Sequence, residues 1–340
     1  MNNILDYNFE SLVKSFEEKK LKKFRVSQVF DWIYSKNEYD FENMTNLSKE
    51  LRSKLVAEYK IDIPELVERK LSKRDGTQKF LFSLDDANTI ESVLLFHGKR
   101  VTACISSQVG CAMGCKFCAT GKSGFVRNLT VGEIIGQILA MQKISEERVG
   151  NIVFMGMGEP LLNFENVKQS ISHFNSDKMF NIGIRRISVS TCGIVPMIER
   201  MAAEIPEVTL SISLHAYDNY TRDALMPVNK KYSVEELIQS VKNYQEITGN
   251  RVTFEYILID GINDSKNDAK ALAKLLKGIK SNVNVIPVNP VDEEFKRPDK
   301  DKTKQFVELM NGLGIETVER IEKGSDIDGA CGQLRIRKLK

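Results

Sequence analysis

Histidines and long apolar segments are scarce in this chain of 340 residues, and each scarcity argues against a class of protein. Only His97, His173 and His215 are present, which leaves little room for a metal site built from several imidazoles. No apolar run approaches the roughly 18 residues that a membrane-spanning helix needs. The residues from Met1 to Tyr7 have neither the basic nor the apolar segment of a signal peptide. We therefore expect a cytoplasmic protein that has no membrane segment.

A large excess of charge of one sign is also missing. The chain has 49 Lys and Arg against 46 Asp and Glu, which leaves a formal net charge of +3. This balance does not by itself indicate a nucleic-acid partner, although local basic clusters can still bind phosphates. One such cluster lies between Lys19 and Arg25, and it is either a solvated face or a phosphate contact.

Cysteines, in contrast, are concentrated in one place. Three of the six, Cys111, Cys115 and Cys118, form a C-x3-C-x2-C run, which suits metal binding in a reducing compartment better than disulfides. Thiolates ligate zinc or an iron–sulfur cluster. A structural zinc site normally has a second pair of ligands, and none is present. A [4Fe–4S] cluster on three cysteines leaves one iron open to a substrate's amino and carboxylate groups. Zinc, or packing of the thiols as small apolar groups, is the alternative.

The periodicity of apolar residues predicts an α/β protein. Residues 1–60 have the helical spacing of apolar side chains, and short strand-like runs with an Asp75-Gly76 turn follow from about residue 66. Six further strands alternate with helical patterns, which predicts a parallel sheet curled as a partial (β/α)6 barrel. These strands are expected at Val101–Ser106, Asn151–Met155, Arg186–Ser190, Val208–His215, Val252–Leu258 and Val283–Val288. The helices are expected near 131–145, 165–175, 195–203, 233–247, 266–278 and 301–312.

Polar and glycine residues follow several of these strands at their carboxyl ends, where α/β barrels bind ligands. Glycines allow a ligand to approach the backbone, and a carboxylate can accept a hydrogen bond from an ammonium group. Each of these residues could instead cap a helix or a loop. Together with the cysteine loop they predict a cofactor site made of Gly158, Glu159, Ser190, Ser213, Leu214, His215 and Asn289.

The cysteine spacing, with Phe117 before the third cysteine, resembles the signature of the radical S-adenosylmethionine (SAM) superfamily, and Met155–Pro160 resembles its "GGE" motif. Six segments are similar to the RlmN/Cfr family of RNA adenosine methyltransferases: Cys104–Cys111, Arg127–Leu129, Met155–Pro160, Ser211–Ala216, Met226–Tyr232 and Asp326–Leu334. The resemblance runs from about residue 20 to residue 335. Glu159-Pro160 and Pro287–Pro290 are closer to the RlmN branch than to the Cfr branch.

This resemblance implies a mechanism. Carbon C2 of adenine is electron-poor and cannot attack a SAM methyl group, but a carbon radical can add to it. In the family pattern, Cys331 matches the residue that receives a methyl group from one SAM, and a second SAM on the open iron yields the radical that activates this methyl group. Cys104 matches the thiol that releases the product through a transient disulfide. Glu91 matches the base that removes the ring proton. Cys192 has no matching role and is expected to be buried.

The resemblance also implies partners and boundaries. It implies 23S ribosomal RNA, and in several bacteria tRNA, as substrates, with flavodoxin or ferredoxin as electron donor and a monomeric enzyme. We expect an RNA-binding accessory domain at 1–60, a β-extension at 61–96, a radical SAM core at 97–325 and a cysteine-bearing tail at 326–340. RNA contacts are expected at Lys19–Arg25, Arg335, Arg337 and Lys338. Methylation at C8, or a zinc-dependent RNA-binding module without catalysis, is the alternative function.

Overall fold

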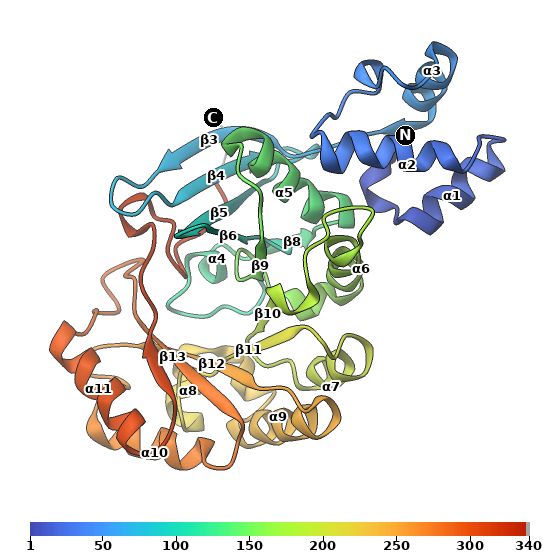
Figure 1. The fold of residues 1–340 in the computed structure, drawn as a ribbon. Helices are drawn as coiled ribbons and strands as arrows, with labels where there is room; N and C mark the ends of the chain where they lie inside the picture. The colour runs from blue at the N-terminus through green and yellow to red at the C-terminus, as the bar shows by residue number, and fades with distance from the viewer. Residues whose placement is uncertain (338–340) are drawn as a thin grey trace.

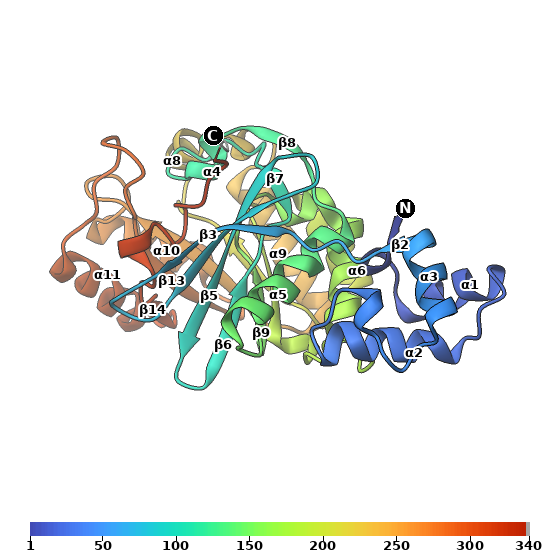
Figure 2. The same cartoon turned by 90° about the horizontal axis from the view of Figure 1, so that it is seen from above.

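The computed structural model describes residues 1–337, in which helices cover one large sheet (Figure 1). An N-terminal helical segment projects to one side of this body in both views (Figure 2). It consists of α1 (Phe9–Glu18), α2 (Phe24–Phe30) with a π-helical turn at Asp31–Ser35, and α3 (Lys49–Glu58). Parallel pairing of β1 (Asn2–Asn3) with β2 (Tyr59–Lys60) brings the two ends of the segment together.

The N-terminal segment has its own apolar core. Helix α1 begins where the Asn8 side chain accepts a hydrogen bond of 2.8 Å from the Ser11 backbone N–H, the usual way to satisfy a free N–H at a helix start. Its buried face carries Leu12 and Phe16, and the Phe16 ring lies 5.8 Å from that of Tyr59. Lys20, Lys22 and Lys23 of the basic cluster are exposed.

Ten strands form one continuous sheet in the order β14-β13-β12-β11-β10-β9-β6-β5-β4-β3. Four of them are antiparallel neighbours: β3 (Glu65–Leu71), β4 (Gln78–Ser83), β5 (Thr89–His97) and β6 (Arg100–Cys104). The Asp75 side chain accepts a hydrogen bond of 2.9 Å from the Thr77 N–H, and Gly76 has a φ of 74°, as the predicted turn requires. Strand β6 also pairs in parallel with β9, so the β-extension continues the main sheet.

The remaining strands are parallel, which confirms the predicted fold class. They are β9 (Asn151–Phe154), β10 (Ile187–Thr191), β11 (Thr209–Ser213), β12 (Val252–Leu258), β13 (Ser281–Pro287) and β14 (Thr317–Glu319). The helices between them are α5 (Val131–Ser145), α6 (Phe164–Asn175), α7 (Val195–Glu204), α9 (Val234–Thr248), α10 (Lys266–Leu276) and α11 (Lys300–Gly312). In the part of the chain that the structure describes, no helix is both long and apolar enough to cross a bilayer.

Several short elements lie at the carboxyl ends of the parallel strands. These are the hairpin of β7 (Gln108–Gly110) and β8 (Phe125–Asn128), and the helices α4 (Ala119–Lys122) and α8 (Asn219–Leu225). The sequence did not predict them or β14, because each has at most seven residues and shows no full period of apolar side chains. Figure 2 shows α4, α8 and the hairpin gathered at one end of the sheet.

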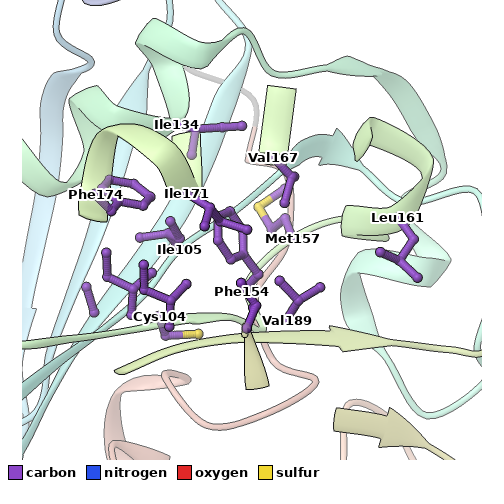
Figure 3. Packing of buried hydrophobic residues seen from close by; sticks show 14 of the residues in the cluster. Cys104, Ile105, Ile134, Phe154, Met157, Leu161, Val167, Ile171, Phe174 and Val189 are labelled. Atoms are coloured by element: carbon purple, nitrogen blue, oxygen red, sulfur yellow. The ribbon is translucent and has the colours of Figure 1, made fainter. Parts of the chain in front are cut away.

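Close packing between the sheet and its outer helices holds this end in place. Figure 3 shows Phe154 of β9 and Val189 of β10 beneath Ile171 and Phe174 of α6. The Phe154 and Phe174 rings lie 6.4 Å apart. Burying side chains of this size stabilises the fold by about 1.5–3 kcal/mol each. Cys104 lies at the edge of the same cluster, at the end of β6.

Candidate active site

The three clustered cysteines lie in the loop between β7 and α4. This loop is held by backbone hydrogen bonds from the Cys111 N–H to the Gly124 carbonyl (2.7 Å) and from the Lys116 N–H to the Leu225 carbonyl of α8 (3.0 Å). A Cβ atom at Gly121 would lie 2.9 Å from the Cys115 backbone nitrogen, so only glycine allows α4 to pack this closely. The loop therefore has a fixed path over the ends of the strands.

One cavity of about 160 Å³ collects most of the predicted site. The cysteine loop and the ends of β9, β10, β11 and β12 contribute to its walls. The predicted residues that line it are Cys111, Cys115, Cys118, Gly158, Glu159, Ser190, Ser213, His215 and Cys331. Asn289 lies in the wall of a neighbouring cavity. Leu214 lines neither, because its side chain is fully buried; its carbonyl accepts a hydrogen bond of 3.0 Å from Arg222 Nε.

The donor set fits a cluster better than a single ion. Among residues 1–337, no three His, Cys, Asp or Glu side chains are placed to hold one metal ion. A [4Fe–4S] cluster does not need such convergence, because each thiolate binds a different iron. Burial raises the pKa of the Cys111 thiol to about 12 and that of Cys115 well above its usual value. Iron binding would supply the positive charge that these buried thiolates need.

Glu159 is a buried carboxylate with a fixed orientation. One of its oxygens accepts a hydrogen bond of 3.0 Å from the Leu161 N–H, and the other accepts one of 2.8 Å from the Cys192 N–H. Burial raises the pKa of Glu159. Cys192 is buried as expected, and it also lines the cavity, a role that the sequence did not suggest. A cationic group entering this cavity would restore the favourable environment that Glu159 loses by burial.

His215 is held as a neutral imidazole. Burial lowers the pKa of His215 to about 3, and its Nδ1 accepts a hydrogen bond of 3.0 Å from the Ile257 N–H. The ring proton is therefore on Nε2, which can donate to a ligand. The Phe117 ring packs edge-on against His215 at 4.9 Å, so the residue before the third cysteine also positions this imidazole.

Cys331 lines two cavities: the one that the cysteine loop lines, described above, and a second one of about 390 Å³. It therefore lies between them. Its carbonyl accepts a hydrogen bond of 3.2 Å from the Asn289 side-chain amide, and the next carbonyl, of Gly332, accepts one of 2.7 Å from the Ala119 N–H. Cys104 lines the second cavity. Burial, and next the neighbouring Cys331, raise the pKa of the Cys104 thiol to about 12.

Arg320 was not singled out in the sequence. It follows β14, lines both cavities, and places its Nη1 3.5 Å from Glu255 Oε2. Interaction with Cys331 is the main reason that the pKa of Arg320 is raised above its usual value. A cation beside the two thiols favours their thiolate forms.

Glu91, the predicted base, lines neither of these two cavities. It is fully buried on β5, where its Oε2 lies 2.9 Å from Lys79 Nζ and accepts a hydrogen bond of 2.9 Å from the Arg335 N–H. Its Oε1 lies 3.0 Å from Arg337 Nε. The C-terminal segment runs back beside β4 and β5 in Figure 1 and covers this carboxylate. Lys338, one of the expected RNA contacts, lies outside the described residues.

Comparison with known proteins agrees with this geometry. A model of the radical SAM superfamily matches residues 105–276, and a model of the ribosomal RNA large subunit methyltransferase N-terminal domain matches residues 2–61. The fold and the cysteine-lined cavity thus define a radical SAM enzyme. A radical SAM methyltransferase from Sphaerobacter thermophilus has a crystal structure that superposes with a TM-score of 0.95 at 40% identity, covering 98% of this chain and 99% of that one.

Full-length relatives specify the family. The "Probable dual-specificity RNA methyltransferase RlmN" of Thermosipho melanesiensis is 58% identical over 340 residues, all of both chains. The protein of the same name from Fervidobacterium nodosum is 57% identical, covering 99% of this chain and 98% of that one. The chain belongs to the RlmN family of radical SAM RNA methyltransferases. Membership implies SAM and a [4Fe–4S] cluster as cofactors and RNA as substrate, and it excludes the non-catalytic zinc module.

Proposed function

We propose that this enzyme methylates C2 of one adenosine in 23S ribosomal RNA and C2 of an adenosine beside the tRNA anticodon, through an S-methylated Cys331. The observation that carries this proposal is the place of Cys331 in the walls of both cavities. A thiol there can receive a methyl group on the cofactor side and deliver it on the other side. The names of the relatives, which include dual specificity, support two RNA substrates.

Cys111, Cys115 and Cys118 would hold the cluster, each through one thiolate. Glu159 would accept the SAM ammonium, and His215 Nε2 would donate to the bound cofactor. Ser190, Ser213, Asn289 and the backbone at Gly158 and Leu214 would complete the cofactor contacts. When bound, the cluster and SAM supply a methyl group and, after one-electron reduction by a flavodoxin or ferredoxin, a radical. Two SAM molecules per turnover follow from these two tasks.

Cys331, Glu91 and Cys104 then act in sequence. The Cys331 thiolate would attack the methyl carbon of one SAM, so that a new S–C bond forms, the bond from that carbon to the SAM sulfur breaks and S-adenosylhomocysteine leaves. After the resulting carbon radical joins C2, the adduct would lose one electron, which the oxidised cluster could take up, and Glu91 would take the ring proton. The Cys104 thiolate attacks the Cys331 sulfur, so that an S–S bond forms, the S–C bond breaks and the carbon takes up a proton as the new methyl group. A dithiol reductant restores both thiols.

RNA binding is assigned to the N-terminal segment and to the mouth of the second cavity. Lys20, Lys22 and Lys23 are exposed on the segment, and Arg100 and Lys323 lie at that cavity. RNA enzymes of this kind take an unstacked base from a folded substrate rather than read a duplex groove. We treat residues 1–60 as the accessory domain, 61–96 as the extension, 97–325 as the core and 326–340 as the tail. We place the enzyme in the cytoplasm, where these RNAs are found, and treat it as a monomer.

Mass mapping of the methyl position on ribosomal RNA and tRNA tests the reaction. We expect 2-methyladenosine in both, and 8-methyladenosine would contradict the C2 assignment. Anaerobic purification tests the cofactor, because cluster-bearing protein is brown and contains iron and sulfide. Ala at Cys111, Cys115 or Cys118 should remove the iron, whereas Cys192→Ala, in the same cavity, should retain it. A ligand variant with full iron content would refute the ligand assignment.

A further inference from the structure

A fully buried arginine lies next to the cysteine loop and, in the part of the chain that the structure describes, has no carboxylate partner. Arg222 on α8 has an exposed fraction of 0%. Its guanidinium donates to three backbone carbonyls: Nε to Leu214 (3.0 Å), and Nη2 to Cys192 (2.7 Å) and Ser213 (3.2 Å). Its Nη1 donates to Asn229 Oδ1 at 3.0 Å. All of these acceptors are neutral.

The nearest linked carboxylate is reached only through Asn229. The Asn229 amide nitrogen donates to Asp223 Oδ1 at 2.7 Å, on the other side of that side chain from Arg222. Within residues 1–337, the acceptors of the Arg222 guanidinium are three backbone carbonyls and one side-chain amide, and none is a carboxylate. A buried charge without a close partner is costly, since burial removes the water that would otherwise solvate it.

Arg222 lies directly behind the wall of the cavity that the cysteine loop lines. Helix α8 contacts this loop through the hydrogen bond from the Lys116 N–H to the Leu225 carbonyl. Cys192 and Ser213, whose carbonyls accept hydrogen bonds from Arg222 Nη2, line the same cavity as Cys115. Negative charge on a cluster bound in this cavity would therefore lie close to the buried guanidinium.

We propose that Arg222 is a positioning residue whose buried positive charge raises the reduction potential of the iron–sulfur cluster. This rests on the proposed cluster ligands Cys111, Cys115 and Cys118. One-electron reduction by an external donor adds one negative charge to the cluster, and no bond to protein changes. A fixed cation in a low-dielectric surrounding stabilises that added charge. Arg222 would thus make the first electron transfer of each turnover easier.

A purely structural role is the competing explanation. Arg222 joins the ends of β10 and β11 through the Cys192, Ser213 and Leu214 carbonyls, so its loss could disturb the site without any electrostatic effect. Two substitutions separate the two roles. Arg222→Lys keeps the charge and loses the fork of hydrogen bonds, whereas Arg222→Gln loses the charge and can still donate hydrogen bonds.

The test is an anaerobic redox titration of the reconstituted, SAM-free, full-length protein, with dithionite as reductant and the EPR signal of the reduced cluster as readout. We expect Arg222→Gln to reduce the equilibrium constant for reduction about tenfold, a shift of about 59 mV to more negative potential for one electron. Arg222→Lys should stay close to the unmodified protein. Arg251→Gln, an equal change of charge at the start of β12 and opposite the cluster end, should cause no shift.

Asp223→Asn keeps the proposal falsifiable if Arg222→Gln does not fold. Its Oδ1 can still accept from Asn229, and the loss of its negative charge should shift the potential in the positive direction. Unchanged potentials in Arg222→Gln or Asp223→Asn, or equal shifts in Arg222→Gln and Arg222→Lys, would overturn the proposal. Absence of iron from the unmodified protein would instead overturn the proposed cluster site, so the two failures are distinguishable.

Discussion

Lys79 Nζ and Glu91 Oε2 lie 2.9 Å apart, and their side chains are exposed by only 2% and 0%. The pair joins neighbouring strands, since Lys79 is on β4 and Glu91 on β5. Lys79 also donates a hydrogen bond of 2.8 Å to the Asp328 carbonyl of the tail. Without Lys79, the buried Glu91 carboxylate would keep only the partly exposed Arg337 as a cationic partner, and loss of one partner from a buried pair is costly. The proposed base is therefore held by groups whose loss affects stability as well as catalysis.

We expect Lys79→Met to lower the free energy of unfolding by about 3 kcal/mol, measured by urea denaturation. Lys54→Met, which breaks an exposed pair with Glu50 on α3, should change it by less than about 0.5 kcal/mol. The double variant Lys79→Met/Glu91→Leu should recover most of the loss, because it removes both charges. Equal stability of Lys79→Met and the unmodified protein would show that the pair contributes nothing net.

Alanine variants of the two cysteines that line the second cavity, Cys104 and Cys331, should stop the reaction at different steps. Cys331→Ala has no methyl acceptor, so we expect neither methylated protein nor methylated RNA. Cys104→Ala can still load Cys331, so it should accumulate RNA attached through a methylene bridge. Glu91→Gln should stall in the same way, because the ring proton cannot leave.

Denaturing gels of protein purified from cells, with and without nuclease, detect this adduct. We expect a slow band in Cys104→Ala that collapses with nuclease and is missing from Cys104→Ala/Cys331→Ala. Cys192→Ala is the control for loss of a buried thiol elsewhere in the site. Normal turnover of Cys104→Ala without any adduct would contradict the two-thiol mechanism.

Charge reversal of Lys20, Lys22 and Lys23 together should weaken RNA binding. Each lost phosphate contact should reduce the slope of log affinity against log salt by about 1. The matched control reverses three exposed lysines of α10, Lys266, Lys270 and Lys274, and thus makes the same change in net charge. If both triple variants bind equally well at low salt, the N-terminal lysines are a plain solvated face.

We expect the protein to lose stability in mild acid because of the buried side chain of His173. This side chain is fully buried on α6, neither ring nitrogen has a hydrogen-bond partner among residues 1–337, and burial lowers its pKa to about 4. The unfolded chain, with a pKa near 6.5, binds more protons below that pH, so stability is complete above about pH 6.5 and falls as the pH approaches 4.

Urea denaturation at pH 7 and pH 5 measures this effect. We expect His173→Leu to reduce the loss of stability between these two pH values by about 2 kcal/mol. His97→Leu, at an exposed position, is the control and should retain most of the loss. An unchanged loss in His173→Leu would mean that other groups cause the acid sensitivity.

The sequence was informative wherever a local pattern determined the structure. The run Val252–Leu258 was predicted as a strand and forms β12 with the same bounds, because a short, mostly apolar run rich in β-branched and aromatic residues suits a buried strand. Helix α5 begins at the predicted position, where Thr130 and Glu133 form a reciprocal cap. The cysteine spacing and the strand-end residues predicted one cavity, and most of them line it.

Contacts between residues distant in sequence could not be predicted in this way. Nothing near Glu91 in the chain indicates that Lys79 and the tail would enclose it, since Arg335 is 244 residues away. Leu214 was expected among the cofactor contacts because it lies between Ser213 and His215. Alternation along the strand instead turns its side chain into the core and leaves only its backbone near the site.

The tail that covers Glu91 also has a consequence for the folding of the chain during its synthesis on the ribosome. The Thr89 hydroxyl donates to the Arg337 carbonyl, 248 residues further along the chain. At about 5–20 residues per second, a ribosome needs about 12–50 s to make that intervening chain. During this interval β4 and β5 have left the ribosome without the cover they carry in the finished protein. The cover over Glu91 is thus completed only by residues that are synthesised long after β4 and β5, and limited proteolysis of arrested nascent chains would detect the uncovered strands.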